Sequence, residues 1–313
     1  MSAPLVSVLI PAYNHEKYIE ACLNSVMLEG YPNLELLILD DGSKDNTHQI
    51  AVDWCNQYGD RFQHCEVSQQ ENRGVVVTLN RLVQMSRGEF ITPLASDDAL
   101  LPGGIAVRLA ELQQRPDWMA VFADAEAMNA NGVTTHKSVL SELYFANKRA
   151  LKNDKLRNYE LILRWSVPGP VFLARKTCYL PENIGLYDSS LAFEDRDYYL
   201  RLLSKRALGF VDAVVARYRM HETNLTKAVN QDKSRLVGGE REMQDSALKN
   251  LPRFVGFERF ALYLNWKATS ARVRWFQQKS VINFFSRLEL LFFSQLGKRL
   301  LDIGNFIYLS TVK

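Results

Sequence analysis

The sequence lacks a long apolar run and a leader-like N-terminus. No stretch of 18 consecutive apolar residues occurs in its 313 residues, so we expect no transmembrane helix. No basic segment precedes the first apolar run, at residues 6–10, and that run has only the length of a strand, so we expect no signal peptide. These two absences predict a cytoplasmic protein.

Cysteine is also scarce. The chain has four cysteines, at Cys22, Cys55, Cys65 and Cys178, and no two of them have a CxxC or other metal-ligand spacing. A thiolate metal site is therefore not expected. Since cysteines of a reducing cytosol stay unpaired, we predict four buried or unreactive thiols.

Glycine-rich phosphate loops are missing after the first expected strand, where the chain reads Pro11-Ala12-Tyr13-Asn14. The absence of G-x-G-x-x-G at this point argues against a Rossmann dehydrogenase. The absence of a Gly-rich loop with Arg or Lys argues against a sugar nucleotidyltransferase. The basic part of the chain contains no recognisable nucleic-acid-binding motif, so nucleic acid is not an expected partner.

Charge is distributed unevenly, although the net charge is only +3. Residues 1–219 hold 23 Lys and Arg against 27 Asp and Glu, a net charge of −4, whereas residues 220–313 hold 15 against 8, a net charge of +7. Most of the excess lies past residue 250, where 10 basic residues face 3 acidic ones. Such asymmetry is typical of a surface that meets an anionic partner.

Strand-like and helix-like segments alternate over residues 1–230. Strands are expected at residues 6–10, 34–39, 62–67, 90–94, 119–122, 169–174 and 210–218, and helices at 16–27, 45 onward, 74–85, 103–115 and 193–203. This alternation predicts an α/β fold with a mostly parallel, Rossmann-like central sheet flanked by helices. From residue 230 on, the pattern is helical without strand signals, so we place a domain boundary there and expect a helical C-terminal extension over 231–313.

Two pairs of acids follow expected strands. Asp40 and Asp41 follow the strand expected at 34–39, and Asp97 and Asp98 follow the one expected at 90–94. Adjacent carboxylates repel one another unless a cation or a hydrogen-bond donor compensates, and oxygen ligands with substrate phosphates are the usual setting of Mg²⁺. The alternative is that these residues cap the helices that follow, since Asp is a favoured N-cap. That alternative is weaker for both pairs together than for any single Asp.

Other candidates are weak when each is taken alone. Tyr13 follows a strand end and has the ring to pack against a base, and Arg73 has the planar guanidinium that suits a phosphate. Glu194 and Asp195 open an expected helix, where a carboxylate accepts a proton or simply complements the helix dipole. His221 is a candidate for a metal ligand or a phosphate donor, although a lone His is more often structural.

Taken together, these segments closely resemble the inverting glycosyltransferases of family 2, which have the GT-A fold. The resemblance covers residues 5–226 in the family's order. The matching pieces are residues 6–14, 39–47, Asn72-Arg73-Gly74, Ser96-Asp97-Asp98, Phe193-Glu194-Asp195 and Tyr218-Arg219-Met220-His221. The first two are highly specific as a pair.

The resemblance implies a role for each matching position, and a GT-A catalytic domain over 1–230. Pro11, Ala12 and Tyr13 would line the nucleoside pocket, Asp41 would read the base, commonly uracil, Arg73 would lie near the nucleotide, and Asp97 would hold the ribose or the sugar. Asp98 would bind Mn²⁺ or Mg²⁺ with support from His221, and Asp195 would be the general base, with Glu194 as its neighbour.

The chain departs from the family pattern at two positions. Relatives often have an acid where this chain has Ala95, so a bound metal would have fewer ligands. Glu29 stands where Gln is common. The missing acid keeps open a second hypothesis, a catalytically degenerate protein that binds a nucleotide sugar; a sugar nucleotidyltransferase is the weaker alternative.

The tail from residue 254 to 313 interleaves aromatic and basic residues. One interpretation is an amphipathic surface on an anionic membrane, which would suit a lipid-linked acceptor and a peripheral position at the inner face of the plasma membrane. The other is packing on the catalytic domain or on a second copy of the chain in a homo-oligomer. The expected protein is thus a metal-dependent transferase that moves a sugar from a nucleoside-diphosphate sugar, UDP-linked by preference, to a glycan or lipid-linked acceptor in polysaccharide biosynthesis.

Overall fold

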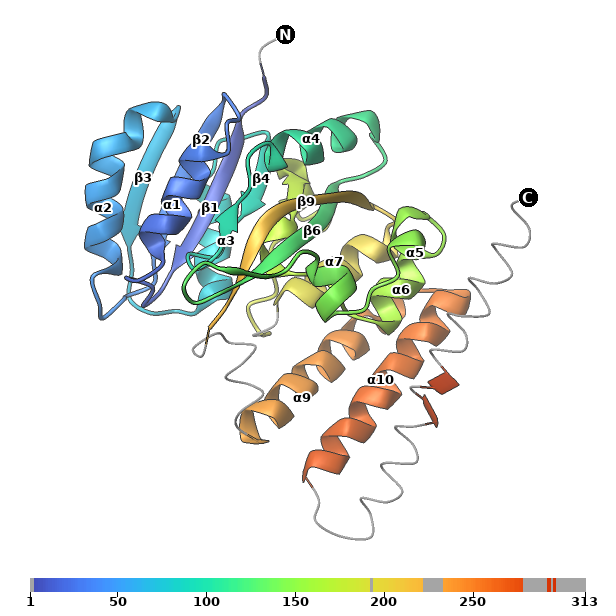
Figure 1. The fold of residues 1–313 in the computed structure, drawn as a ribbon. Helices are drawn as coiled ribbons and strands as arrows, with labels where there is room; N and C mark the ends of the chain where they lie inside the picture. The colour runs from blue at the N-terminus through green and yellow to red at the C-terminus, as the bar shows by residue number, and fades with distance from the viewer. Residues whose placement is uncertain (1–2, 192–193, 222–232, 278–291, 294, 297–313) are drawn as a thin grey trace. The chain divides into compact units, whose positions relative to one another are not determined.

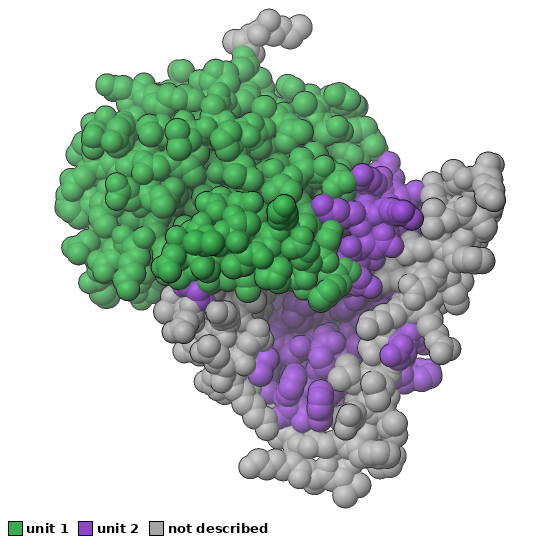
Figure 2. Space-filling view, in the orientation of Figure 1, with its two compact units in different colours: residues 1–145, 167–190, 207–220 green, residues 146–166, 191–206, 221–313 purple. Residues whose placement is uncertain are grey.

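The computed structural model describes residues 3–191, 194–221, 233–277, 292–293 and 295–296. The chain forms two compact units, coloured separately in Figure 2. The first consists of residues 1–145, 167–190 and 207–220, and the second of residues 146–166, 191–206 and 221–313. The second unit therefore includes two segments from before residue 230, where the sequence predicted a single boundary.

The first unit begins with alternating strands and helices, as the sequence predicted. They are β1 (Val6–Ala12), α1 (Ile19–Leu28), β2 (Leu34–Asp40), α2 (Thr47–Tyr58), β3 (His64–Gln69), α3 (Val75–Met85) and β4 (Phe90–Pro93). The four strands are parallel, in the order β3-β2-β1-β4. Right-handed crossovers then carry α1 and α2 to one face of the sheet and α3 to the other, as Figure 1 shows.

The strand register aligns the polar strand ends. Ala12 of β1 lies beside Asp40 of β2, and Asp40 lies beside Gln69 of β3. β1 and β2 are buried along nearly their whole length, since their Val, Leu and Ile side chains face helices on both sides. The polar residues that follow the two strands therefore emerge at one edge of the sheet.

The rest of this unit makes the sheet mixed. It contains β5 (Ala99–Leu100), α4 (Gly104–Gln114), β6 (Ala120–Asn129), β7 (Thr134–His136), β8 (Leu173–Arg175) and β9 (Leu208–Met220). The sheet continues from β4 in the order β8-β6-β9-β5, with β7 on β6. β6 and β9 are parallel, and β8, β5 and β7 pair antiparallel. The predicted α/β class with a mostly parallel sheet is confirmed.

Two predicted strands differ most in extent, whereas the bounds of the others shift by at most two residues. The strand expected at 169–174 is a 3₁₀ turn at Gly169–Val171 followed by the short β8, because Pro170 has no N–H to give to a strand ladder. The strand expected at 119–122 extends to Asn129, because β9 is 13 residues long and pairs with it throughout. Short helical turns also occur at Gly59–Arg61, Val139–Leu143 and Lys176–Tyr179.

The second unit is helical in the residues that the structure describes. Its helices are α5 (Lys148–Lys152), α6 (Arg157–Leu163), α7 (Glu194–Ser204), α9 (Lys233–Asn250) and α10 (Gly256–Gln277), with a 3₁₀ turn at Leu251–Arg253. α10 packs along α9 and α6, and α7 packs on α9. The predicted C-terminal helices are present, and none of the described helices has both the length and the apolarity to cross a membrane.

The prediction of four unpaired cysteines is wrong for two of them. Cys55 of α2 and Cys65 of β3 form a disulfide, with their Cα atoms 6.3 Å apart. The chain turns back between α2 and β3 and brings the two residues together, which the spacing of ten residues did not reveal. Cys22 and Cys178 form no disulfide and are buried, as expected.

Candidate active site

The loops after β1 and β2 are tied together at the carboxyl edge of the sheet. The Asp41 N–H donates to the Ala12 carbonyl at 2.8 Å. The Asn14 N–H donates to Ser43 Oγ at 2.9 Å, and the Lys44 N–H donates to Asn14 Oδ1 at 2.8 Å. These bonds leave Tyr13 between them with 43% of its surface exposed. An aromatic ring is thus held at the rim of the loop pair.

Asp41 binds the loop that carries Arg73. Its buried carboxylate accepts hydrogen bonds from Gln70 Nε2 at 2.7 Å, from the Arg73 N–H at 2.9 Å and from the Gly74 N–H at 2.8 Å. Arg73 is itself exposed. Two predicted nucleotide residues, Asp41 and Arg73, therefore lie together, and Asp41 sets the position of the loop after β3.

Asp40 has a different set of contacts. Its carboxylate accepts from the Ser43 N–H at 3.0 Å and from Gln69 Nε2 at 2.8 Å, and also bonds the Ser43 hydroxyl. Gly42, between Asp41 and Ser43, has φ +76°, a left-handed conformation that favours glycine. Asp40 therefore stabilises this turn, and Asp41 reaches the neighbouring loop.

Asp98 is buried and engaged within the first unit. Its Oδ1 accepts a hydrogen bond from the Arg219 N–H of β9 at 2.8 Å, and Arg219 Nε donates to the Asp97 carbonyl at 2.6 Å. Burial and the charge of Asp97 hold the pKa of Asp98 well above its usual range. Burial, followed by Asp98 and Asp97, likewise raises the pKa of the Cys22 thiol. A cation bound beside Asp97 and Asp98 would favour the ionised form of both carboxyl groups.

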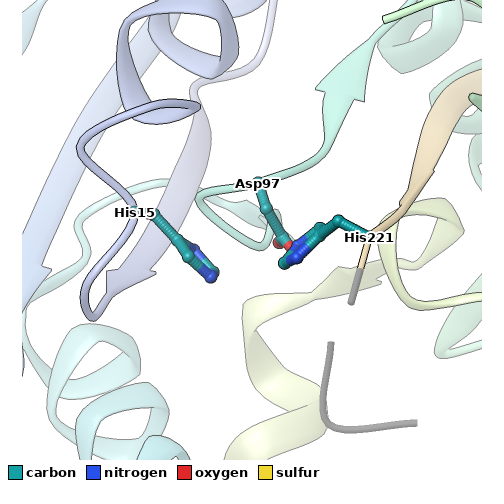
Figure 3. A group of neighbouring side chains, drawn as sticks. All are labelled: His15, Asp97 and His221. Atoms are coloured by element: carbon teal, nitrogen blue, oxygen red, sulfur yellow. The ribbon is translucent and has the colours of Figure 1, made fainter. Parts of the chain in front are cut away.

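A group of possible metal ligands forms around Asp97 rather than Asp98. His15, Asp97 and His221 each offer a ligand atom, and these atoms all lie within 4.8 Å of one another. Figure 3 shows His15, on the loop after β1, extending toward Asp97 and His221. His221 is one peptide bond beyond Met220, the last residue of β9. His15 Nδ1 is 2.8 Å from Ser96 Oγ, which fixes the orientation of its ring.

This group fits a divalent cation. Protein ligands lie about 2.0–2.6 Å from such an ion, so atoms that share one ion are at most about 4–5 Å apart. Sequence reasoning assigned the metal to Asp98 and His221 and did not single out His15. The available signal was its place directly after the Pro11-Ala12-Tyr13-Asn14 loop, at the same edge as the acids.

Glu194 and Asp195 begin α7 in the second unit. Both keep some solvent-accessible surface, but surrounding protein removes much of the water from their carboxyl groups. This desolvation, then the charge of Asp195, raises the pKa of Glu194 to about 8. Desolvation also raises the pKa of Asp195, against the lowering effect of the Arg196 N–H and of the Arg196 charge. Around neutral pH the pair therefore carries a proton on Glu194.

Residues 7–165 match the family model of Glycosyl transferase family 2. An uncharacterized glycosyltransferase of Rickettsia typhi is 28% identical over 232 residues, which cover 73% of this chain and 68% of the relative. The matched residues include the loops of Tyr13, Asp41, Arg73 and Asp97.

Two solved structures show the same fold at low sequence identity. The mannosyltransferase PcManGT from Pyrobaculum calidifontis, in complex with GDP-Man and Mn²⁺, has a TM-score of 0.65 at 15% identity, over 98% of this chain and 81% of that one. TarS 1–349 from S. aureus, in complex with UDP-GlcNAc, has a TM-score of 0.56 at 17% identity, over 96% and 92% of the two chains.

Proposed function

Because the chain belongs to glycosyl transferase family 2, we propose that it moves a sugar from a nucleoside-diphosphate sugar to a hydroxyl of a glycan or lipid-linked acceptor. Transfer inverts the configuration at the anomeric carbon. The observation that carries the proposal is the meeting of the polar strand ends of the first unit, with Tyr13, Asp41 and Arg73 on bonded loops.

The nucleoside half of the donor binds at the loops after β1 and β2. Pro11, Ala12 and the exposed ring of Tyr13 pack against the base and ribose. Asp41 accepts three hydrogen bonds from protein, and a carboxylate has about four lone-pair sites, so one acceptor site remains for a base N–H. Arg73 binds a phosphate oxygen. UDP is the preferred nucleotide, and the GDP-Man complex of PcManGT makes GDP the alternative to test.

His15, Asp97 and His221 would hold a divalent cation, and the buried carboxyl group of Asp98 follows Asp97 directly and is held by the Arg219 N–H. This assignment replaces the predicted pair of Asp98 and His221. When bound, the ion offsets the negative charge of the leaving nucleoside diphosphate. Two imidazoles and one carboxylate favour Mn²⁺ over Mg²⁺, which prefers oxygen ligands alone. His15 supplies a ligand in place of the acid that many relatives have at the position of Ala95.

Asp195 is the general base. It removes the proton from the acceptor hydroxyl as that oxygen attacks the anomeric carbon and the bond to the diphosphate oxygen breaks. A raised pKa makes Asp195 a stronger base than an ordinary carboxylate, provided that it stays ionised. The proton on Glu194 serves this purpose, because a neutral neighbour does not repel the charge of Asp195.

A screen of nucleotide sugars tests the proposal. The thermal midpoint of the protein is measured with UDP, GDP and their sugar derivatives, with and without Mn²⁺, since ligands that bind the native state raise it. Turnover of the donors that bind is then followed by release of the nucleoside diphosphate. Binding with turnover supports a transferase. Binding without turnover for every donor favours the degenerate binder, and no binding at all contradicts both hypotheses.

An exposed apolar and basic surface at the start of α10 suggests that the protein binds a lipid-linked acceptor at a membrane. Val255, just before α10, is 78% exposed, and Phe257 and Phe260 at the start of α10 are 75% and 44% exposed; Arg253 and Arg259, close to them in the sequence, are exposed too. Apolar and basic side chains together are typical of a surface that lies on an anionic membrane. Of the two interpretations of the tail, these residues favour the membrane for the start of α10.

A further inference from the structure

Arg196 is a buried cation that joins three helices of the second unit. It lies in the first turn of α7, directly after Asp195, and only 1% of its surface is exposed. Its Nη1 donates to the Met243 carbonyl of α9 at 2.8 Å, and its Nη2 donates to Asn265 Oδ1 of α10 at 2.6 Å. A single guanidinium thus connects the start of α7 to both long C-terminal helices.

The two acceptors of this guanidinium are neutral oxygens. Burying a charge is costly unless hydrogen bonds and opposite charges compensate, so the positive charge depends on acids nearby. Burial lowers the pKa of Arg196 to about 10, and Asp195, Glu240 and Asp197 act against this lowering. At neutral pH Arg196 therefore remains charged, its charge lowers the pKa of Asp195, and its backbone N–H donates to Asp195 Oδ1 at 2.6 Å.

We propose that Arg196 is a positioning residue through which α9 and α10 fix the first turn of α7 and, with it, the carboxyl group of Asp195. The inference rests on the proposed role of Asp195 as the base. It gives the C-terminal helices α9 and α10 a part in catalysis, because they bind the guanidinium of Arg196, the residue that follows Asp195. Arg196 itself need not touch the substrate.

The charge of Arg196 acts on the ionisation of Asp195 together with several other groups. Those that face this part of α7 are, on α7 itself, Glu194 and Asp197, on α9, Glu240 and Glu242, and on α10, Arg272. Arg272 forms an ion pair of 2.8 Å with Glu240, and its positive charge lowers the pKa of Arg196. Arg196 is the cation whose effect on Asp195 is direct.

The test is the pH dependence of kcat/KM in Arg196→Met, with Arg196→Lys beside it. Loss of the cation should make Asp195 harder to ionise, so the acidic limb of the profile should move up by about one pH unit. The KM for the donor should change little, and activity should recover above the limb. Arg196→Lys, which keeps the charge, should return the limb most of the way.

Arg206→Met is the matched control. Arg206 follows α7 and also contacts α10, through a 2.8 Å bond from its Nη2 to Glu258, but it is not next to Asp195. Its removal should leave the limb in place. If Arg196→Met does not fold, Asn265→Ala is used instead. This variant keeps the guanidinium but removes the acceptor of Arg196 Nη2 on α10, and it should lower kcat while changing KM less.

Two results overturn the inference. One is a uniform loss of activity in Arg196→Met with an unmoved limb, and the other is an unchanged kcat in Asn265→Ala. Failure of the proposed base is distinguished by Asp195→Asn. If that variant retains full turnover, the assignment of Asp195 is wrong whatever Arg196 does. If it is inactive while the limb of Arg196→Met stays in place, only the inference about Arg196 fails.

Discussion

The two acids at the start of α7 are adjacent in sequence but differ in what burial does to them. Glu194 has a pKa of about 8, far above its ordinary 4.5. An acid that holds its proton in the folded state stabilises the fold at low pH. This stability is lost as pH rises from 4.5 toward 8, because the unfolded chain gives up the proton over that interval and the folded protein does not.

Glu194→Gln should therefore stabilise the protein at alkaline pH. Glutamine mimics the protonated acid at every pH, so the variant should match wild type below pH 4.5 and exceed its thermal midpoint increasingly up to pH 8. Melting curves from pH 4 to 9 measure the difference. Equal midpoints at pH 8 and 9 would show that Glu194 ionises normally.

The metal assignment rests on His15. His15→Ala should weaken Mn²⁺ binding by at least about tenfold, because it removes one of three protein ligands and the imidazole that compensates for Ala95. Calorimetric titration with Mn²⁺ alone measures the affinity without any need for turnover. His136→Ala, on β7 and outside the group, is the control and should bind as wild type does. An unchanged affinity in His15→Ala would exclude His15 from the site.

Some residue roles could be read from the sequence and others could not. The resemblance to the family assigned both Asp41 and Arg73 to the nucleotide, and in the structure the Arg73 N–H donates to Asp41 Oδ1. His15 was missed because it follows the family motif and a lone His carries no pattern. The departure at Glu29 has a structural explanation: its carboxylate accepts from the N–H groups of Ile105 at 2.6 Å and Tyr31 at 2.8 Å, which holds the start of α4.

At the scale of elements, the turn after β2 depends on Gly42. A Cβ at this position would meet the Asn72 nitrogen at 3.0 Å and the Gln70 carbonyl oxygen at 3.1 Å, both backbone atoms of the loop after β3. Gly103 has almost the same φ, +77°, with nothing within 4 Å. A side chain at either glycine would be strained by the left-handed backbone. Only at Gly42 would it also collide with a second loop.

Gly42→Ala should lower the free energy of unfolding more than Gly103→Ala does. The left-handed conformation should cost each variant about 1–2 kcal/mol of folding free energy. Gly42→Ala should also displace the loop of Arg73. Urea unfolding measures the two losses, and a titration with UDP should show weakened binding in Gly42→Ala alone. Equal losses and equal UDP affinities would contradict a site built from two closely packed loops.

Apart from β5, the strands and helices of the first 114 residues were predictable because each has a clear period and a turn at its end. The strand at 119–122 was predicted too short, since its length comes from pairing with β9, about 90 residues away in the chain. β5 has two residues and is set by its antiparallel partner β9. Elements defined by long-range pairing leave little local signal.

At the scale of the whole molecule, the sequence showed that the C-terminal part differs from the rest, but not where its partners lie. Residues 146–166 and 191–206 belong to the same unit as the C-terminal helices. Asp197 and Asn250, 53 residues apart, meet through a 2.7 Å hydrogen bond from Asn250 Nδ2 to Asp197 Oδ1. Polar pairs of this kind carry no sequence period, so a linear reading divides the chain at 230.

The exposed start of α10 should bind anionic lipid. Replacing Val255, Phe257 and Phe260 by serine in the full chain should reduce co-sedimentation with phosphatidylglycerol vesicles several-fold. The variant loses the apolar side chains that would insert into the lipid and bring the basic residues to its surface. Phe145→Ser is the control, since Phe145 is 70% exposed in the first unit. Equal sedimentation of all three proteins would remove α10 as a membrane contact.

The account as a whole depends on Asp195 as the base of an inverting transfer, and Asp195→Asn tests it most directly. The amide cannot take the acceptor's proton, so transfer from the nucleotide sugar that binds best should fall by about 10²–10⁴-fold. The affinity for that donor, measured on the same preparation, should stay within a few-fold of wild type. Transfer at the wild-type rate by the Asn variant would contradict the account.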